Sequence, residues 1–134
     1  MEAPTTAHLA AVKHLLRYIA GTRRYRCKYV KCSTGGLIGY SKSDMAGDID
    51  DRKSTSGNIF FLGGAPITWQ LQKQKIIALS SCEAEYVAAT TAACQGIRLS
   101  RLSGDLFMEE AGAVIVFIDN KLTIQLCKNH VFHD

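Results

Sequence analysis

The stretch Leu79-Ser80-Ser81-Cys82-Glu83-Ala84-Glu85-Tyr86-Val87 lies where a strand-like run, 76–79, gives way to a long helical pattern. Ser80 stands three residues before Glu83, the S-x-x-E spacing of a capping box, in which the serine hydroxyl accepts from a free backbone N–H of the first turn. Glu85 follows about one turn into the helix, where a carboxylate is held rigidly and still meets solvent, metal or substrate. Both glutamates also favour a helix N-terminus electrostatically, and this is the role that we assign to Glu83. This stretch alone leaves the role of Glu85 open.

Length and composition are those of one ordinary domain. The chain has 134 residues, of which 47% are hydrophobic and 21% charged, as in a soluble globular protein with a single core. No apolar run approaches the ~18 residues of a membrane span, and no signal peptide is visible. The five cysteines are odd in number and lack C-x-x-C spacing, so we predict free thiols in a reducing compartment. We therefore expect an intracellular protein, cytoplasmic or nuclear, that is not secreted.

The net charge of +4 is distributed unevenly. Residues 1–43 carry eight Lys or Arg against one Glu, a charge of +7, while residues 44–134 carry eight basic and eleven acidic groups, a charge of −3. A basic front end beside an acidic body suits a phosphate backbone that approaches a metal-binding carboxylate cluster. A solvated basic face with no partner explains the same charge. The candidate nucleic-acid contacts are Arg23, Arg24, Arg26 and Lys28.

Hydrophobic periodicity and turn residues divide the chain into helices and strands. We expect helices from Thr5 or Thr6 to Ala20, from Ser81 to about Leu102, and from Asn120 to about Lys128. Strands are expected over 25–31, 37–41, 57–62, 65–70, 73–79 and 114–118, with a polar loop over 43–56 and a hairpin turn at Gly63-Gly64. The alternation of strands and helices predicts an α/β (α+β) fold with a mixed sheet and flanking helices.

The apolar residues predict which surfaces are buried. The run 114–118 is continuously apolar, which is typical of a strand covered on both faces. The first helix has an apolar stripe of Leu9, Val12, Leu16 and Ile19. The predicted buried positions of the long helix are Val87, Ala88, Thr91, Cys94, Ile97, Leu99 and Leu102.

Four runs together resemble one family. They are Leu37-Ile38-Gly39-Tyr40-Ser41, residues 48–61 (DIDDRKSTSGNIFF), residues 78–90 (ALSSCEAEYVAAT) and Ile118-Asp119-Asn120. The chain resembles the ribonuclease H domain at the end of a copia-type LTR-retrotransposon polyprotein, over roughly residues 9–133. Residues 1–24 resemble the tail of the reverse-transcriptase connection, and residues 25–134 resemble a truncated ribonuclease H-like domain.

The resemblance implies a five-stranded sheet in the order 3-2-1-4-5 and an enzyme that cleaves the RNA strand of RNA/DNA hybrids. In this family four carboxylates bind two Mg²⁺ ions. Two metals ~3.5–4 Å apart activate a water and stabilise the leaving oxygen, and they need several anionic oxygens around them.

Carried over to this chain, the metal-binding carboxylates are Glu85 on the helix and Asp119 at the end of the fourth strand. The first position of the family's Asp-Ala-Asp motif is here Lys42, in Lys42-Ser43-Asp44. Asp44 is the remaining candidate for that role, although along a strand it would lie ~6.6 Å from the position of Lys42. The fourth carboxylate is expected beyond 131–133, and the sequence ends at Asp134, so we expect the fifth strand and last helix of the family fold to be lacking.

Three functions follow from these residues. The first is a retrotransposon-derived ribonuclease H-like protein that is catalytically impaired but keeps some affinity for RNA/DNA hybrids. The second is a domesticated protein-interaction module without a nucleic-acid role. The third is a weakly active metal-dependent nuclease that uses Asp44, Glu85 and Asp119. Lys42 and the expected truncation argue against catalysis, and the basic front end favours the first function over the second.

The expected truncation also predicts assembly. The strand 114–118 would then be an edge without charge or proline, and such edges recruit another strand. We therefore expect a homodimer, or another protein, to cover the sheet near 114–118.

Overall fold

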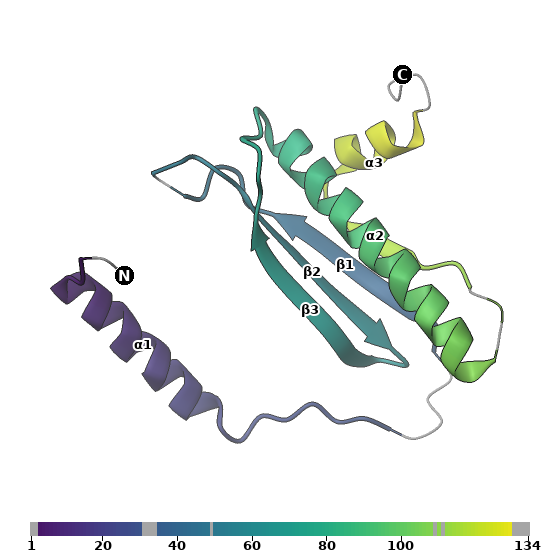
Figure 1. The fold of residues 1–134 in the computed structure, drawn as a ribbon, viewed down its shortest axis with the longest axis horizontal. Coiled ribbons are helices and arrows are strands. Elements are labelled where there is room, and N and C mark those ends of the chain that lie inside the picture. The colour runs from purple at the N-terminus through teal and green to yellow at the C-terminus, as the bar shows by residue number, and fades with distance from the viewer. Residues whose placement is uncertain (1–2, 31–34, 49, 109, 111, 130–134) are drawn as a thin grey trace.

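Four strands form one mixed sheet that carries helices (Figure 1). The computed structural model describes residues 3–30, 35–48, 50–108, 110 and 112–129. Its elements are α1 (Thr6–Thr22), β1 (Leu37–Ser43), β2 (Thr55–Leu62), β3 (Ala65–Lys73), α2 (Ser81–Phe107), β4 (Ile115–Ile118) and α3 (Lys121–Lys128). The order in the sheet is β3-β2-β1-β4, with β1 parallel to β4 and antiparallel to β2. The predicted mixed sheet with helices is confirmed, and the order is the one that the resemblance implies for its first four strands.

Local side-chain chemistry sets where the helices begin. Thr5 accepts a hydrogen bond from the His8 backbone N–H (3.3 Å), and His8 Nδ1 accepts from the Thr5 N–H (3.1 Å). Ser80 Oγ accepts from the Glu83 N–H (3.1 Å) at the start of α2. Asn120 accepts from two backbone N–H groups in the first turn of α3. All three predicted helix starts are confirmed, because a cap depends on residues three positions apart.

The hairpin between β2 and β3 turns at two glycines. Gly63 and Gly64 have φ values of 58° and 80°, the left-handed conformations that a two-residue hairpin turn requires at both positions. The predicted turn is therefore confirmed.

The helix α2 lies against one face of the sheet through small side chains. Its buried residues are Ala84, Glu85, Ala88, Ala89, Ala92, Gly96 and Ser100. Of the predicted buried positions only Ala88 is fully buried, whereas Cys94, Ile97 and Leu102 are exposed. The prediction was wrong because close packing on a sheet selects small residues along the contact line and leaves larger ones on the flanks.

Phe60 on β2 fills the space that these small residues leave. Its side chain is 0% exposed. A Cβ at Gly39 on the neighbouring strand would lie 2.5 Å from Phe60 Cε1, and one at Gly96 on α2 would lie 3.4 Å from the same atom. Two glycines, one on the sheet and one on the helix, therefore form the pocket for one aromatic ring.

Two predicted strands are absent from the described residues. Residues 25–30 are extended but join no sheet, and position 31 lies outside the described residues. They contact the sheet through the Tyr29 hydroxyl, which donates a hydrogen bond to the Pro66 carbonyl (2.9 Å). Residues 74–79 also form no strand, because the Gln74 side chain turns into the interior and ends β3. In contrast, α2 continues five residues past the predicted end to Phe107 and closes at Met108, which has a left-handed φ of 57°.

The opposite face of the sheet is not covered by the described residues. Ile115 and Phe117 of β4 are both at least half exposed, so the expectation that 114–118 is covered on both faces was wrong. Within the described residues β4 also pairs on one side only, with β1. The predicted lack of a fifth strand and last helix concerns positions beyond 129, outside the described residues.

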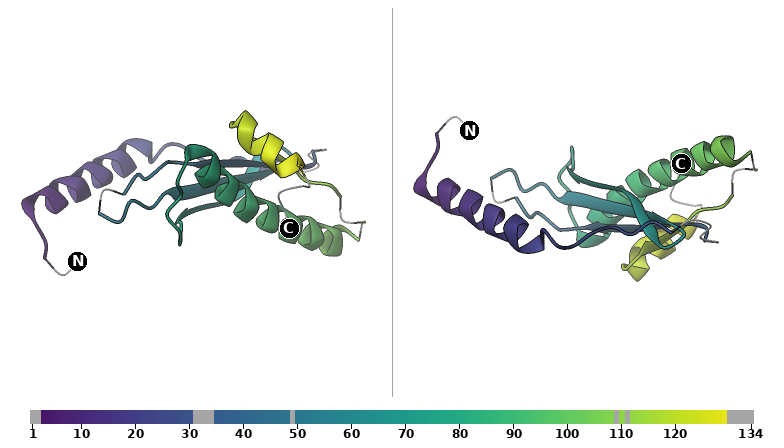
Figure 2. Two further views of the ribbon diagram at one scale, coloured as in Figure 1. Left: turned by 90° about the horizontal axis from the view of Figure 1, so that it is seen from above. Right: turned by 90° about the horizontal axis from the view of Figure 1, so that it is seen from below.

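The first helix stands apart from the sheet. All views place α1 beyond β3, joined to β1 by an extended segment (Figures 1 and 2). The division between residues 1–24 and 25–134 stays a prediction. No helix in the described part of the chain combines the length and apolar character needed to cross a membrane.

Candidate functional site

Three elements bring charged side chains together at one end of the sheet. The strands β1 and β4 are parallel and in register at Ser41 and Ile118, so the next residues, Lys42 and Asp119, lie side by side. Glu85, in the first turns of α2, is 6% exposed. Its Oε1 accepts a hydrogen bond from the Ser43 backbone N–H (3.0 Å), which fastens the start of α2 to the end of β1.

Lys42 forms an ion pair with Asp119. Lys42 Nζ lies 2.7 Å from Asp119 Oδ2, and both side chains are largely exposed. The hydrogen bond and the charge of Asp119 raise the pKa of Lys42, and the nearby Glu85 carboxylate adds to this effect. The same hydrogen bond lowers the pKa of Asp119. The lysine therefore places a positive charge directly on Asp119 and near Glu85, the two carboxylates that the resemblance assigns to metal binding.

These donors do not fit a two-magnesium centre. Mg²⁺ prefers an octahedron of oxygen ligands, and two close ions need several shared carboxylates. Here Lys42 stands at the position where the resemblance implies a shared carboxylate, and its ammonium group binds Asp119. Within the described residues no group of three or more His, Cys, Asp or Glu side chains is arranged to hold a metal.

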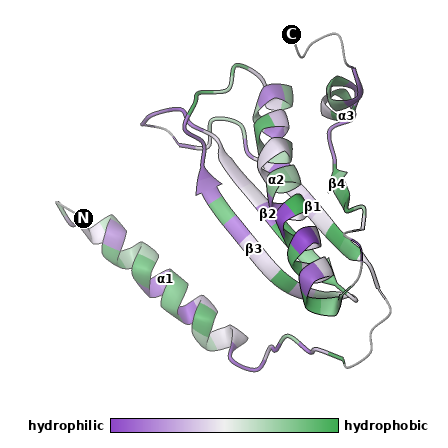
Figure 3. Ribbon diagram, turned by 45° about the vertical axis from the view of Figure 1, so that its right-hand side comes forward, coloured by the Kyte–Doolittle hydropathy of each residue, from purple (hydrophilic) through white to green (hydrophobic). Residues whose placement is uncertain are grey.

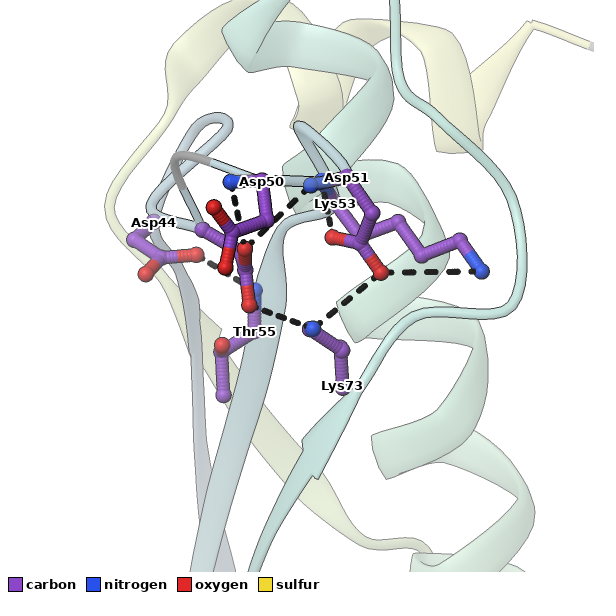
Figure 4. Close-up of polar contacts among 7 residues, drawn as sticks. Asp44, Asp50, Asp51, Lys53, Thr55 and Lys73 are labelled. Atoms are coloured by element: carbon purple, nitrogen blue, oxygen red, sulfur yellow. Dashed lines mark hydrogen bonds and ion pairs between the residues drawn. The ribbon is translucent and has the colours of Figure 1, made fainter. Parts of the chain in front are cut away.

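Asp44 lies just beyond the same end of the sheet, but its carboxylate is held within its own loop. Its Oδ1 accepts a hydrogen bond from the Thr55 backbone N–H at the start of β2 (Figure 4). A Cβ at Gly47 would collide with Asp44 Oδ2, so this carboxylate lies inside its own loop. The structure thus brings Glu85, Asp119 and Lys42 together and gives Asp44 a place in the 44–54 loop.

The rest of this loop is held to β3 by Lys73. Lys73 Nζ forms ion pairs with Asp48 and, at 3.1 Å, with Asp51 Oδ2 (Figure 4). Asp48 Oδ1 also accepts from the backbone N–H groups of Asp50 and Asp51. The hydrogen bond from Lys73 and those two N–H groups lower the pKa of Asp48 to about 2. Asp44, Asp48 and Asp51 of this segment therefore have structural partners.

Gln74 is a residue of the site that the sequence did not reveal. Its side chain is buried, and Nε2 lies within hydrogen-bond distance of Ser56 Oγ (2.8 Å), the Ala84 carbonyl (2.9 Å) and Ser43 Oγ (3.2 Å). It thus connects β1, β2 and the turn of α2 that carries Glu85. The one signal in the sequence is its place in a polar stretch before a helix, and that does not distinguish it from Gln70 or Gln72.

The interior around this site is polar and only partly satisfied. Four buried oxygen atoms there have no hydrogen-bond partner among the described residues: Ser41 Oγ, Asn58 Oδ1, Gln74 Oε1 and Glu85 Oε2. Buried polar groups of this kind are commonly satisfied by ordered water. The carboxylate of Glu85 thus keeps one oxygen able to accept a further donor.

The predicted basic residues lie away from the carboxylates. Arg23, Arg24, Arg26 and Lys28 (the basic segment) are all exposed, the first two in the turn that ends α1 and the other two in the extended stretch that follows. The Tyr29 hydroxyl anchors this stretch to Pro66 on β3. Pro66 pairs with Phe61 on β2, and Phe61 pairs with Ile38 on β1. Ile38 lies four residues before Lys42 on β1, a distance of ~13 Å. The basic segment and the carboxylates are therefore anchored at opposite ends of the sheet.

Comparison with known proteins gives several relatives. The chain is 41% identical over 133 residues to the retrovirus-related Pol polyprotein from transposon TNT 1-94 of Nicotiana tabacum, and 42% identical over 135 residues to that from transposon RE2 of Arabidopsis thaliana. Each match covers 99% of this chain but only 10% and 9% of the relative, so the chain spans about a tenth of these polyproteins.

A third relative is of similar size. The secreted RxLR effector protein 161 of Plasmopara viticola is 40% identical over 97 residues, which are 72% of this chain and 68% of that protein. No family model and no solved structure matches the chain. The long matches at about 40% identity nevertheless establish common descent, and the chain belongs to the family of sequences related to the Pol polyproteins of copia-type retrotransposons.

Proposed function

We propose that the chain is a ribonuclease H-like domain derived from a retrotransposon Pol polyprotein, and that it binds RNA/DNA hybrids without cleaving them at an appreciable rate. The domain assignment is supported by the strand order β3-β2-β1-β4 and by the meeting of Glu85 and Asp119 at one end of the sheet. The proposed lack of cleavage rests on the ion pair between Lys42 and Asp119.

The charge at this site is wrong for metal-assisted hydrolysis. A two-metal mechanism needs anionic ligands that share the ions and so reduce their mutual repulsion. Lysine at the shared position removes one such ligand and adds a positive charge that a metal ion would have to displace from Asp119. Glu85 retains a free oxygen, but one carboxylate cannot hold two ions. The residues present therefore do not supply the ligands that a step through two Mg²⁺ ions needs.

Cleavage of a labelled RNA/DNA hybrid in Mg²⁺ or Mn²⁺ tests the proposal. The expected result is no cleavage above the level of a buffer control. The Lys42→Asp variant, run in parallel, asks whether the lysine alone prevents turnover. Cleavage by the unmodified chain that is abolished by Glu85→Gln would overturn the proposal, since a contaminating nuclease would not respond to that substitution.

Hybrid binding is proposed to depend on the basic segment. Contacts of Lys and Arg with phosphates release counterions, so affinity falls as salt rises, with a slope of about −0.9 for each phosphate contact on B-DNA. Changing the four residues of the basic segment to alanine should weaken binding and flatten this salt dependence. The matched control changes four exposed basic residues elsewhere, Arg98, Arg101, Lys121 and Lys128, at the same cost in charge. Equal loss of binding in both variants would show that the affinity depends on net charge and not on the basic segment.

A protein-interaction role is the second candidate. It is supported by the apolar face of the sheet that the described residues leave uncovered. Single exposed apolar side chains are common on protein surfaces, whereas a group of them on one face often marks an interaction site. Absence of hybrid binding at low salt would favour this role over the first.

A further inference from the structure

The uncovered face of the sheet carries one continuous apolar row. Trp69, Ile59, Tyr40 and Phe117 are register partners across β3, β2, β1 and β4. The Tyr40 and Phe117 rings are stacked at 5.2 Å, and Trp69 is 68% exposed. Together with Leu71, which is 79% exposed, they line a shallow hollow of about 560 Å³. This row (the open face) is an apolar surface with a defined shape and no cover within the described residues.

The same chain has an apolar surface without a partner on α1. The stripe of Leu9, Val12, Leu16 and Ile19 recurs at helical spacing, and none of the α1 residues is buried. Leu16 alone is 60% exposed. Apolar and polar bands alternate along α1 (Figure 3). An amphipathic helix gains most of its stability by packing this stripe against another surface.

The helix and the open face match in size. A helix of 17 residues is about 25 Å long at 1.5 Å per residue, with a diameter of about 10–12 Å. Strands of 8 and 9 residues, as in β2 and β3, are about 26–30 Å long, and four strands span about 14 Å between the outer axes. One helix that lies along the strands therefore covers most of the open face.

The charges bordering the two surfaces are also complementary. The helix α1 has no acidic residue and carries Lys13 and Arg17. At the end of the sheet near Leu71, the loop 44–54 has four aspartates against Arg52, Lys53 and the Lys73 that pairs with two of them, which leaves a net charge of −1 at this border. Opposite charges at the rim of an apolar contact orient the partners and raise the rate of encounter.

We propose that the open face binds the α1 helix of a second copy of this chain, and that two chains exchange α1 helices in a two-fold dimer. Each chain supplies one helix and one open face, so a reciprocal exchange closes with both apolar surfaces covered. The exchange also keeps the extended path of residues 25–30, which in the structure carries α1 away from its own sheet (Figure 1).

The chemistry of the open face favours a helix over nucleic acid. Single-stranded nucleic acid needs free ring faces together with unpaired cations that track the phosphates. Here Tyr40 and Phe117 stack on each other, and the two lysines at the edge of the face, Lys42 and Lys73, are paired with aspartates. Aliphatic side chains make up much of the remaining surface, and these suit the stripe of a helix.

Trp69 is the single tryptophan of the chain, so its fluorescence reports on the open face directly. The emission is recorded from roughly 1 μM to roughly 500 μM protein, beside sedimentation or light scattering on the same samples. The expected result is a blue shift on dimer formation. The variants Leu16→Lys on the helix and Leu71→Lys on the open face should each raise the dimer Kd roughly thirty-fold or more. Tyr18→Lys, on the opposite side of α1, should leave the Kd unchanged.

Each other outcome overturns the exchange. A blue-shifted monomer at every concentration that responds to Leu16→Lys would mean that α1 covers its own sheet. A monomer whose emission is that of exposed tryptophan throughout would mean that α1 does not bind the face. A dimer that is insensitive to both Leu16→Lys and Leu71→Lys would assign assembly to another surface. Quenching of Trp69 by a single-stranded oligonucleotide, with no dimer, would identify nucleic acid as the occupant.

Discussion

Replacing Gln74 with alanine tests the claim that one buried amide joins the elements around Glu85. The substitution removes the donor that faces Ser43 Oγ, Ser56 Oγ and the Ala84 carbonyl. Because an amide nitrogen carries two hydrogens, the three contacts represent about two hydrogen bonds, each with a net contribution of about 1 kcal/mol. Leaving buried acceptors unpaired and opening a small cavity adds a similar amount. We therefore expect the free energy of unfolding to fall by about 2–4 kcal/mol.

This loss is measurable by urea denaturation and by calorimetry. Against a typical total of about 5–15 kcal/mol, it should lower the Tm by roughly 10 °C for a chain of this size. The matched control is Gln72→Ala, since Gln72 is exposed on β3 two residues before Gln74 and its loss should change stability by no more than about 0.5 kcal/mol. Equal effects of the two substitutions would refute the role given to Gln74.

Three further predictions concern the neighbouring charges and the core. Asp48 has a pKa of about 2 in the fold, below the ordinary value of 3.8, so its contacts stabilise fully above about pH 4 and are lost as the pH falls toward 2. Asp48→Asn should weaken the acid dependence of unfolding in that window, and denaturation at a series of pH values checks this. Lys42→Ala should raise the pKa of Asp119, because the ammonium that lowers it is gone, and an NMR titration of the carboxyl would detect no change if the ion pair were absent in solution. Gly39→Ala should destabilise by about 1–3 kcal/mol because the new Cβ overlaps Phe60, whereas a neutral result in thermal unfolding would show that the ring moves freely.

Features governed by local chemistry could be predicted from the sequence. The helix starts at Thr5, Ser80 and Asn120, and the Gly63-Gly64 turn, depend on residues a few positions apart. The alternation of apolar residues also located most of the strands. These features need no knowledge of the rest of the chain.

Features that depend on distant contacts could not be predicted. Small residues of α2 face the sheet because Phe60 needs room, and nothing within the helix indicates this. The strand-like run at 76–79 is not a strand because Gln74 is bound by groups from three elements. Lys42 could be recognised as unusual at its position, but its pairing with Asp119 depends on the register of β1 with β4.

The central claim is that Lys42 binds Asp119 and leaves no site for a divalent metal. Mn²⁺ added to the ¹⁵N-labelled chain measures this directly, because a bound paramagnetic ion broadens the amide signals around it. Amides next to an exposed surface carboxylate serve as the reference for weak binding. At about 1 mM Mn²⁺, we expect the Ser43 and Asp119 amides to broaden no more than this reference. Selective broadening of these two signals at low Mn²⁺, lost in the Glu85→Gln variant, would contradict the account.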